Sequence, residues 1–410
     1  MTGFDSLWND LLPIGRDART GGYRRFAWTP ADLECREWFT AAAQDRGLDL
    51  ETDRNGNLWA WWGDPAAGSA VVVGSHLDSV PDGGAYDGPL GVVSAFAALD
   101  DLRARGVAPE RPIAVAAFSD EEGARFGVAC GGSRLLTGAL DPDWARNLRD
   151  SDGTTMAEAM AAAGHDPAQL GAEPDRLARI ACFVELHIEQ GRVRVETADG
   201  PSYGLAGLDT PLGLASGIWP HGRWRIELAG RADHAGTTRL EDRDDAMLLF
   251  AATVLAAREA AIRHDALATI GKVRVEPNGV NAIPSGVTAW LDVRGADEPR
   301  VRAVVADLAG DLQGEHARVQ EESWTAPTTF SESLRDRLAR ILDSPPVIPT
   351  GAGHDAGILA AAGVSSAMLF VRNPTGTSHS PVEHAERADC LAGVAALAAV
   401  VADLATGPAD

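Results

Sequence analysis

The sequence predicts an α/β domain, with a mixed sheet flanked by helices, that is interrupted by an inserted α+β domain. Two observations lead to this prediction. In the first half, short and wholly apolar runs alternate with helical segments, as expected for strands buried on both faces of a sheet. After about residue 210, apolar and polar residues alternate instead, which is typical of half-exposed antiparallel strands, and the first pattern returns after about residue 325.

The first half contains three apolar runs that we expect to be strands. These runs are followed by polar loops, and ligand sites in α/β sheets lie at the carboxyl ends of the strands. Thr29 is a candidate cap for the first helix, because a proline follows it. The predicted strands are 70–74, 113–118 and 182–188, and the predicted helices are 31–46 and a segment that begins near Val92.

The middle of the chain shows a β-α-β-β pattern, typical of a small α+β unit. Its strands are 222–229, 268–275 and 287–294, with a helix from Asp244 to about His264 after the first. A helix over 331–342, a strand over 366–371 and a helix from about 386 to 405 then complete the α/β domain. The predicted boundaries are 1–210 and 326–410 for the α/β domain and 211–325 for the inserted domain.

The composition excludes several classes of protein. With 36 basic and 59 acidic residues the net charge is −23, which argues against binding to nucleic acid or to an anionic membrane. A small anionic substrate stays possible, because a bound cation reverses the charge locally. The longest apolar runs, such as 246–257, are shorter than a membrane span, and the acidic start does not resemble a signal peptide. Four scattered cysteines indicate reduced core residues, so we expect a cytoplasmic protein.

Polar side chains gather after the predicted strands, and their types match metal ligands. Taken singly, each has an alternative: Asp87 could cap the next helix, Glu121 and Glu122 could be solvated surface charge, and His379 lies in a turn. Taken together, imidazole and carboxylate groups suit Zn²⁺, Mn²⁺ or Co²⁺. Two such ions about 3.5–4 Å apart would hold one water between them as hydroxide. The candidates are His76, Asp78, Asp87, Glu121, Glu122, His187, Glu189 and His379.

The motifs that contain these residues resemble those of a known superfamily. In chain order they are GSHLDSVPDGGAYDGPLGV, FSDEEGARFG, ELHIEQG, ADHAGTT, PNGVNAIPSGVTAWLDVRG, GAGHDAG and SHSPVEHA. The series resembles the metal-dependent amidohydrolases of the aminoacylase/carboxypeptidase superfamily. Within it, ELHIEQG and HAGTT favour the branch of allantoate amidohydrolases and N-carbamoyl-L-amino-acid hydrolases over the dipeptidases.

The resemblance implies a catalytic α/β domain that binds two divalent metal ions per subunit, Zn²⁺ or Mn²⁺, with Co²⁺ as an alternative. Glu121 would be the general base, and Asp78 would orient the ring of His76. Asp87 would bridge the two ions. The five metal ligands that the resemblance implies are His76, Asp87, Glu122, His187 and His379.

For the inserted domain, the resemblance implies a lid that also forms a homodimer. His234 would stabilise the oxyanion in the partner's site, and the planar guanidinium of Arg294 would bind the substrate carboxylate. Without the resemblance, Arg294 would read as a surface charge at the end of a strand. His221 stands where relatives often have glutamine, and this departure leaves the identity of the substrate open. The further substrate contacts that the resemblance implies are Gln190, His221, Asn281 and Gly353.

The resemblance therefore implies a hydrolase that cleaves a ureido or carbamoyl C–N bond of a small carboxylate substrate and releases ammonia and carbon dioxide. Allantoate, which would place the enzyme in purine catabolism, and an N-carbamoyl-L-amino acid are the leading substrates. Another N-acyl amino acid, such as N-formyl-L-glutamate, is an alternative in the same class. A non-catalytic metal- or ligand-binding relative is the alternative from a different class, although Glu121 and all the ligand residues are present.

Overall fold

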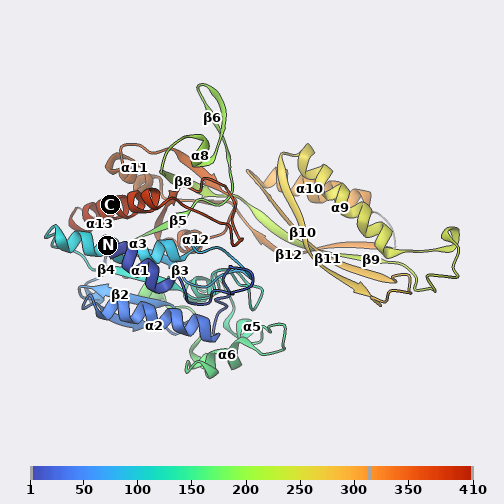
Figure 1. Ribbon diagram of the computed structural model, residues 1–410, viewed down its shortest axis with the longest axis horizontal. Helices are drawn as coiled ribbons and strands as arrows, with labels where there is room; N and C mark the ends of the chain where they lie inside the picture. Colours follow the sequence, from blue (N-terminus) through green and yellow to red (C-terminus); the bar gives the residue numbers. More distant parts are fainter. Residues whose placement is uncertain (1–2, 313–315, 408–410) are drawn as a thin grey trace. The chain divides into compact units, whose positions relative to one another are not determined.

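The computed structural model describes residues 3–312 and 316–407, which form two compact units (Figure 1). Unit 1 consists of Met1–Gly217 and Thr329–Asp410, and unit 2 is Ile218–Thr328. Unit 2 therefore interrupts the chain of unit 1, and each unit has an apolar core of its own.

Unit 1 is built on a nine-stranded mixed sheet. Its four central strands are parallel, in the order β4, β3, β5 and β15. Because the carboxyl ends of parallel strands meet at one edge of a sheet, the loops that follow these strands gather there. The central strands are β3 (Ala70–His76), β4 (Ile113–Phe118), β5 (Ile180–Ile188) and β15 (Ser365–Val371). The outer strands are β1 (Asp49–Thr52), β2 (Leu58–Trp62), β8 (Leu212–Ile218), β13 (Thr328–Thr329) and β14 (Val347–Thr350).

Strand β5 shows how helices cover both faces of this sheet. Alternate side chains, such as Val184 and Leu186, join the main apolar core, to which five helices contribute. Glu185 points to the opposite face, where its carboxylate accepts the N–H of Ala356 at the start of α12. The core helices are α1 (Gly3–Leu11), α2 (Pro30–Gln44), α3 (Pro89–Ala104), α11 (Glu332–Ile341) and α13 (Arg387–Thr406). The predicted fold class, a mixed sheet flanked by helices, is confirmed.

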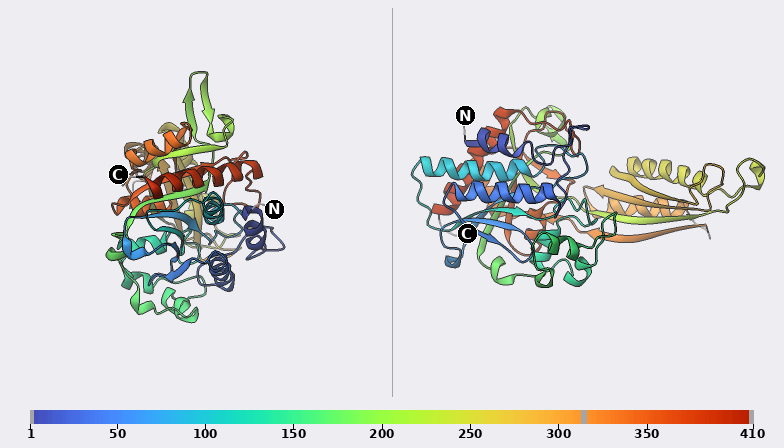
Figure 2. Two further views of the ribbon diagram at one scale, coloured as in Figure 1. Left: turned by 90° about the vertical axis from the view of Figure 1, so that its left-hand side faces the viewer. Right: turned by 60° about the horizontal axis from the view of Figure 1, so that its bottom comes forward.

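Smaller elements complete unit 1. A second apolar cluster forms beside the main core and includes Trp28, Leu135, Met156 and Met160. The hairpin of β6 and β7 projects from the rest of the unit as a two-stranded sheet (Figure 2). These elements are α4 (Gly131–Thr137), α5 (Pro142–Arg146), α6 (Met156–Ala162), α7 (Pro174–Leu177), β6 (Arg194–Thr197), β7 (Gly200–Tyr203), α8 (Gly204–Gly207) and α12 (Asp355–Ala361).

Unit 2 is a four-stranded antiparallel sheet in the order β10, β11, β9 and β12. Two helices pack on one face of it, and their apolar side chains form the core of the unit together with alternate residues of β9 and β11. The elements are β9 (His221–Ala229), α9 (Ala246–Arg263), β10 (Ala266–Glu276), β11 (Gly286–Gly295), α10 (Glu298–Asp311) and β12 (Ala317–Thr325).

Two local predictions differ from the structure. The β-α-β-β pattern omitted α10 and β12, although Asp297 caps α10 through the N–H of Arg300 and Pro299 lies in its first turn. Strand β12 was not predicted because it carries many charged residues. Such residues are tolerated there because the strand lies at the edge of the sheet, where one side faces solvent. Thr29 precedes α2 as expected, but its hydroxyl donates to the carbonyl of Phe26 and makes no cap hydrogen bond.

Helix α13 (Arg387–Thr406) matches the predicted helix of about 386 to 405 to within one residue at each end. Among the described residues it is the one helix that is long and apolar enough to cross a membrane by length and composition. In the structure, 61% of that window is buried, and Leu397, Val400 and Leu404 lie in the main apolar core. These contacts are those of a core helix.

Candidate metal centre

The carboxyl ends of the parallel strands bring the predicted ligands together. His76 is the last residue of β3, Glu121 and Glu122 follow β4, and His187 is the penultimate residue of β5. His379 lies in the loop after β15. Strands separated by many residues in the chain are neighbours in the sheet, so their ends supply one site.

Asp87 joins two groups of possible ligands. Its Oδ1 lies 3.6 Å from Nε2 of His76 and 3.1 Å from Nε2 of His187. Its Oδ2 lies 3.3 Å from Nε2 of His379, which is 3.6 Å from Oε2 of Glu122. His76, Asp87 and His187 could hold one metal ion, and Asp87, Glu122 and His379 could hold another. The geometry thus contains two clusters that share one carboxylate.

The hydrogen bonds of the histidines suit metal binding. Nδ1 of His76 lies 3.2 Å from the carbonyl oxygen of Asp78, and Nδ1 of His187 lies 2.8 Å from that of Ile188. A carbonyl can only accept, so Nδ1 carries the proton in both rings and Nε2 keeps its lone pair when the ring is neutral. Both Nε2 atoms are buried without a hydrogen-bond partner, as is Oε1 of Glu122. Divalent cations would satisfy these atoms.

The pKa shifts within the cluster also indicate a site for a cation. Burial would raise the pKa of Asp87, but the imidazoles of His187, His379 and His76 beside its oxygens hold it well below its usual value. The hydrogen bond to Asp87 and the charge of Glu122 raise the pKa of His379 to about 9. Burial, and then the charge of Asp87, raises the pKa of Glu122 to about 7. Buried carboxylates so close together need positive charge beside them, which a divalent ion supplies.

Asp78 connects the loops after β3 and β4. Its Oδ1 accepts the N–H of Glu121 at 3.1 Å, and its Oδ2 accepts the N–H of Glu122 at 3.0 Å. The same Oδ1 lies 3.5 Å from Nδ1 of His76. The buried carboxylate of Asp78 therefore holds the backbone of Glu121 and Glu122 in place after β4. It also contacts the ring of His76.

Glycine at position 88 is required by the close approach of α3 to the ligands. Gly88 has a φ of +85° and precedes the first residue of α3. A Cβ atom at this position would lie 2.4 Å from Cε1 of His76. Only glycine combines that backbone conformation with that contact, and it lets Asp87 face the imidazoles.

Glu383, which the sequence analysis did not assign, holds the loop of Asp87. Glu383 is buried, and its Oε1 accepts the N–H groups of Tyr86 and Asp87 at 3.0 and 3.1 Å. Its Oε2 accepts the hydroxyl of Ser378, the neighbour of His379. Glu383 thereby links the segments that carry two of the ligands, although 296 residues separate it from Asp87. The one sequence signal was its place in the motif SHSPVEHA.

The predicted contacts Gln190 and Gly353 lie in unit 1 with the metal ligands. Nε2 of Gln190 donates to Oδ2 of Asp87 at 2.7 Å, and its Oε1 is buried without a partner. Gly353 precedes His354, whose ring lies 4.5 Å from that of His187. Burial, and then the neighbouring charge of His187, keeps the pKa of His354 well below its usual value.

In unit 2, the structure brings His234 and Asn281 together. The two segments form a β-bridge, and the N–H of Ala235 donates to the carbonyl of Asn281. Nδ1 of His234 accepts the N–H of Gly236 at 3.0 Å. In the neutral ring the proton is therefore on Nε2, which leaves Nε2–H as an exposed donor.

His221 and Arg294 form a second pair in unit 2. They are opposite each other on β9 and β11. The guanidinium of Arg294 makes two hydrogen bonds to Asp292, at 2.7 and 3.1 Å, which fix its plane. Nδ1 of His221 lies 3.1 Å from the carbonyl of Trp219, and burial lowers the pKa of its ring.

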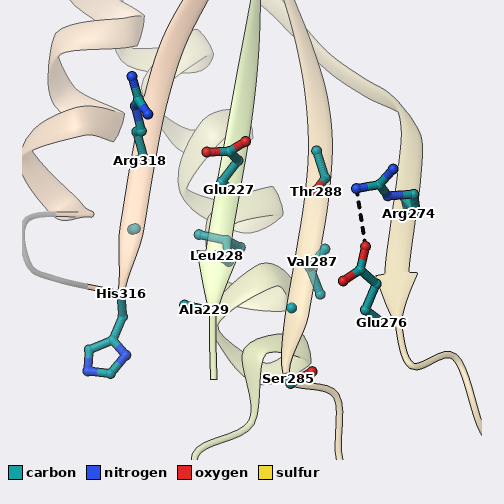
Figure 3. A pocket seen from close by; sticks show the side chains of 12 residues that line it. Glu227, Leu228, Ala229, Arg274, Glu276, Ser285, Val287, Thr288, His316 and Arg318 are labelled. Atoms are coloured by element: carbon teal, nitrogen blue, oxygen red, sulfur yellow. Dashed lines mark ion pairs between the residues drawn. The ribbon is translucent and has the colours of Figure 1, made fainter. Parts of the chain in front are cut away.

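Unit 2 also has a hollow on its sheet, between β9, β10, β11 and β12 (Figure 3). Arg274 forms an ion pair with Glu276 there, and His316 and Arg318 line the opposite side. None of the predicted site residues lines this hollow. We assign it no role in the chemistry of the metal centre.

Comparison with known proteins gives consistent matches. Residues 72–403 match the model of peptidase family M20/M25/M40. The chain is 35% identical to an N-carbamoyl-L-amino acid amidohydrolase of Geobacillus stearothermophilus, over 98% of this chain and 99% of the relative. It is 32% identical to an allantoate amidohydrolase of Escherichia coli (strain K12), over 99% of both chains. A crystal structure of an amidase of the hydantoinase/carbamoylase family from Burkholderia vietnamiensis matches with a TM-score of 0.86 and 28% identity, over 99% of this chain and 98% of that one.

Proposed function

The chain belongs to peptidase family M20/M25/M40, and we propose that it hydrolyses a ureido or carbamoyl C–N bond of a small carboxylate substrate. Its relatives include an N-carbamoyl-L-amino acid amidohydrolase and an allantoate amidohydrolase, and those two substrates are our candidates. The observation that carries the proposal is the pair of ligand clusters that share Asp87, with Glu121 beside them.

Two divalent ions, Zn²⁺ or Mn²⁺ with Co²⁺ as an alternative, would be held by the ligand clusters described above. When bound, such ions lower the pKa of water and polarise a carbonyl group. The buried Nε2 atoms of His76 and His187, which lack hydrogen-bond partners, support this assignment.

In the proposed mechanism, Glu121 acts as general base and then as general acid. Oε2 of Glu121 lies 3.7 Å from Nε2 of His76, at the rim of the first cluster. It takes a proton from the attacking water and delivers it to the leaving nitrogen. Burial raises the pKa of Glu121 well above its usual value, a direction that favours a role as general acid and base.

Residues of unit 2 would bind the substrate. Nε2–H of His234 is proposed to donate to the carbonyl oxygen as negative charge develops on it. The guanidinium of Arg294, held in plane by Asp292, would bind the substrate carboxylate, with Asn281 and His221 as further contacts. On the side of unit 1, Gln190 and the backbone N–H of Gly353 are the proposed contacts.

We also propose that the protein is a homodimer in which His234 completes the partner's site and unit 2 acts as lid and dimerisation domain. Helix α9 supports this, because three large apolar residues spaced seven apart are exposed on it: Leu248, Leu255 and Ile262, at 70%, 63% and 69%. Strand β10, at the edge of the sheet, exposes Leu267 and Val273. A second copy of unit 2 would cover both surfaces.

A cytoplasmic location is proposed from the cysteines. All four are buried, as expected for core cysteines of a protein in a reducing compartment. In cell fractionation we expect the protein with cytoplasmic markers, and recovery with the periplasm or culture medium would contradict this location.

The proposed function is tested with purified protein loaded with Mn²⁺ or Zn²⁺, after a chelator has removed other metals. Allantoate, several N-carbamoyl-L-amino acids, N-formyl-L-glutamate and a dipeptide are offered in turn, with both ammonia and free amine measured. We expect ammonia from allantoate or from a carbamoyl amino acid, and none from the chelated protein. Turnover of the dipeptide or the formyl compound alone would overturn the proposed bond specificity.

A further inference from the structure

Cys130 contacts Glu121 in two places. Its Sγ lies 3.6 Å from Oε1 of Glu121, within hydrogen-bond distance for a thiol donor. Its backbone N–H donates to the carbonyl of Glu121 at 2.5 Å. The residue is 2% exposed, so the contact is sealed from solvent. One residue thus holds both the backbone and the carboxylate of Glu121.

The backbone at position 130 makes a cysteine there unexpected. Cys130 has φ 56° and ψ 39°, in the left-handed region, directly before the first residue of α4. Glycine adopts this conformation without the steric cost that a Cβ atom brings. Non-glycine residues in this region are often kept at functional sites, where the side chain has a use. The thiol is the feature that glycine would lack.

The two oxygens of Glu121 face different partners. Oε1 faces the thiol of Cys130, and Oε2 faces Nε2 of His76. A donor on Oε1 leaves Oε2 as the oxygen that is directed at the ligand cluster. Burial raises the pKa of the Cys130 thiol well above its usual value, so the S–H is retained as a donor.

We propose that Cys130 is a positioning residue for the reaction: its S–H donates to Oε1 of Glu121 and aims Oε2 at the attacking water. This inference rests on the proposed function, because it takes Glu121 as the general base. Cys130 touches neither the proposed ligands of the metal ions nor the substrate in this account, and acts through Glu121.

The test compares three variants of Cys130 in the metal-loaded enzyme. Cys130→Ala removes the donor, Cys130→Ser keeps a shorter donor, and Cys130→Gly removes the donor while relieving the left-handed backbone. We expect kcat to fall about tenfold in the alanine and glycine variants, with KM unchanged, since a misdirected base slows the chemical step. The serine variant should recover about a third or more of the wild-type kcat, because its hydroxyl is also a donor.

Thermal unfolding separates positioning from packing. Cys130→Gly is expected to melt at or above the temperature of Cys130→Ala and still to show the same loss of kcat. If the thiol only fills space, kcat should instead follow thermal stability, so that the more stable of these two variants is also the more active. Cys35→Ala, which removes an equally buried thiol from α2, is the matched control and should keep the wild-type kcat.

Glu121→Gln distinguishes failure of this inference from failure of the proposed function. In the residual rate of Glu121→Gln, the alanine change should cause no further loss, because Cys130 acts through that carboxylate. An inactive Glu121→Gln together with a fully active Cys130→Ala would overturn the role of Cys130 alone. A fully active Glu121→Gln would overturn the general base and, with it, the inference.

Discussion

At the scale of single residues, the site depends on side chains that orient the ligands. Asp78 binds two backbone N–H groups after β4, and Glu383 binds two more before α3. Both carboxylates are buried and make hydrogen bonds to the segments that carry the ligands. Such supporting contacts typically change metal affinity by about 10–100-fold when they are removed.

Glu383 gives the first prediction. Glu383→Ala leaves the N–H groups of Tyr86 and Asp87 unsatisfied, so we expect metal affinity to fall by about 10–100-fold. Glu383→Gln keeps one acceptor oxygen and should fall between this variant and the wild type. The measurement is the metal retained during dialysis against a graded series of chelator concentrations. The exposed Glu386→Ala is the matched control, and wild-type retention by Glu383→Ala would contradict the assigned role.

His165 gives a prediction about pH and stability. Burial, and then the charge of Arg36, lowers the pKa of His165 below its usual value of about 6.5. The unfolded chain therefore binds a proton at this position before the folded chain does, so the stabilisation is complete above about pH 6.5 and is lost as the pH falls below it. Urea unfolding at several pH values should show a smaller loss between pH 7 and 5 for His165→Gln than for wild type. An equal loss in both proteins would contradict this.

At the scale of helices and strands, the amino-acid pattern predicted the buried strands well. The runs at 70–74, 113–118 and 182–188 correspond to β3, β4 and β5, because residues buried on both faces are continuously apolar. Strand β12 was missed, because a strand at a sheet edge with a solvated side carries charged residues. The role of Glu383 was also not predictable, since its partners lie 296 and 297 residues away in the chain.

The metal ligands could not be predicted from local sequence alone. Each of these residues also had a purely structural interpretation, and Asp87, for example, could have capped a helix. In the structure Gly88 precedes α3 without a side-chain cap, and Asp87 faces three imidazoles instead. Two features favoured the metal centre beforehand: the gathering of imidazole and carboxylate residues after the predicted strands, and the order of the motifs along the chain. Spacing alone could not have done so, because the contacts join the ends of four separate strands.

Helix α9 gives the prediction at this scale. Leu255 lies in the middle of its exposed apolar surface, and Leu255→Asp places a charge where the second subunit is proposed to pack. We expect the dimer to dissociate at micromolar protein concentration, as seen by sedimentation velocity, while the circular dichroism spectrum is retained. Glu259→Asp, on the same helix, is a control that keeps the charge. A monomeric wild-type protein, or a stable dimer of Leu255→Asp, would contradict the proposed interface.

At the scale of the whole molecule, the proposed dimer predicts complementation between subunits. Glu121→Gln and His234→Ala should each be inactive alone. In a mixed dimer, the His234→Ala subunit supplies an intact Glu121 and its partner supplies His234, so one of the two sites is complete. After refolding the two variants together in equal amounts, we expect about a quarter of the wild-type activity, from random pairing in a two-fold dimer. Absence of recovery would show that His234 acts within its own subunit or that no dimer forms.

Glu121, beside the two ligand clusters, is proposed to act as the base that hydrolyses a ureido or carbamoyl bond. The most direct test is the rate of ammonia release from allantoate and N-carbamoyl-L-amino acids by wild-type protein and Glu121→Gln, both with measured metal content. We expect ammonia from the wild type and a rate about a hundredfold or more lower for the variant at equal metal content. Equal rates, or no ammonia from any of these substrates with both metal sites filled, would contradict it.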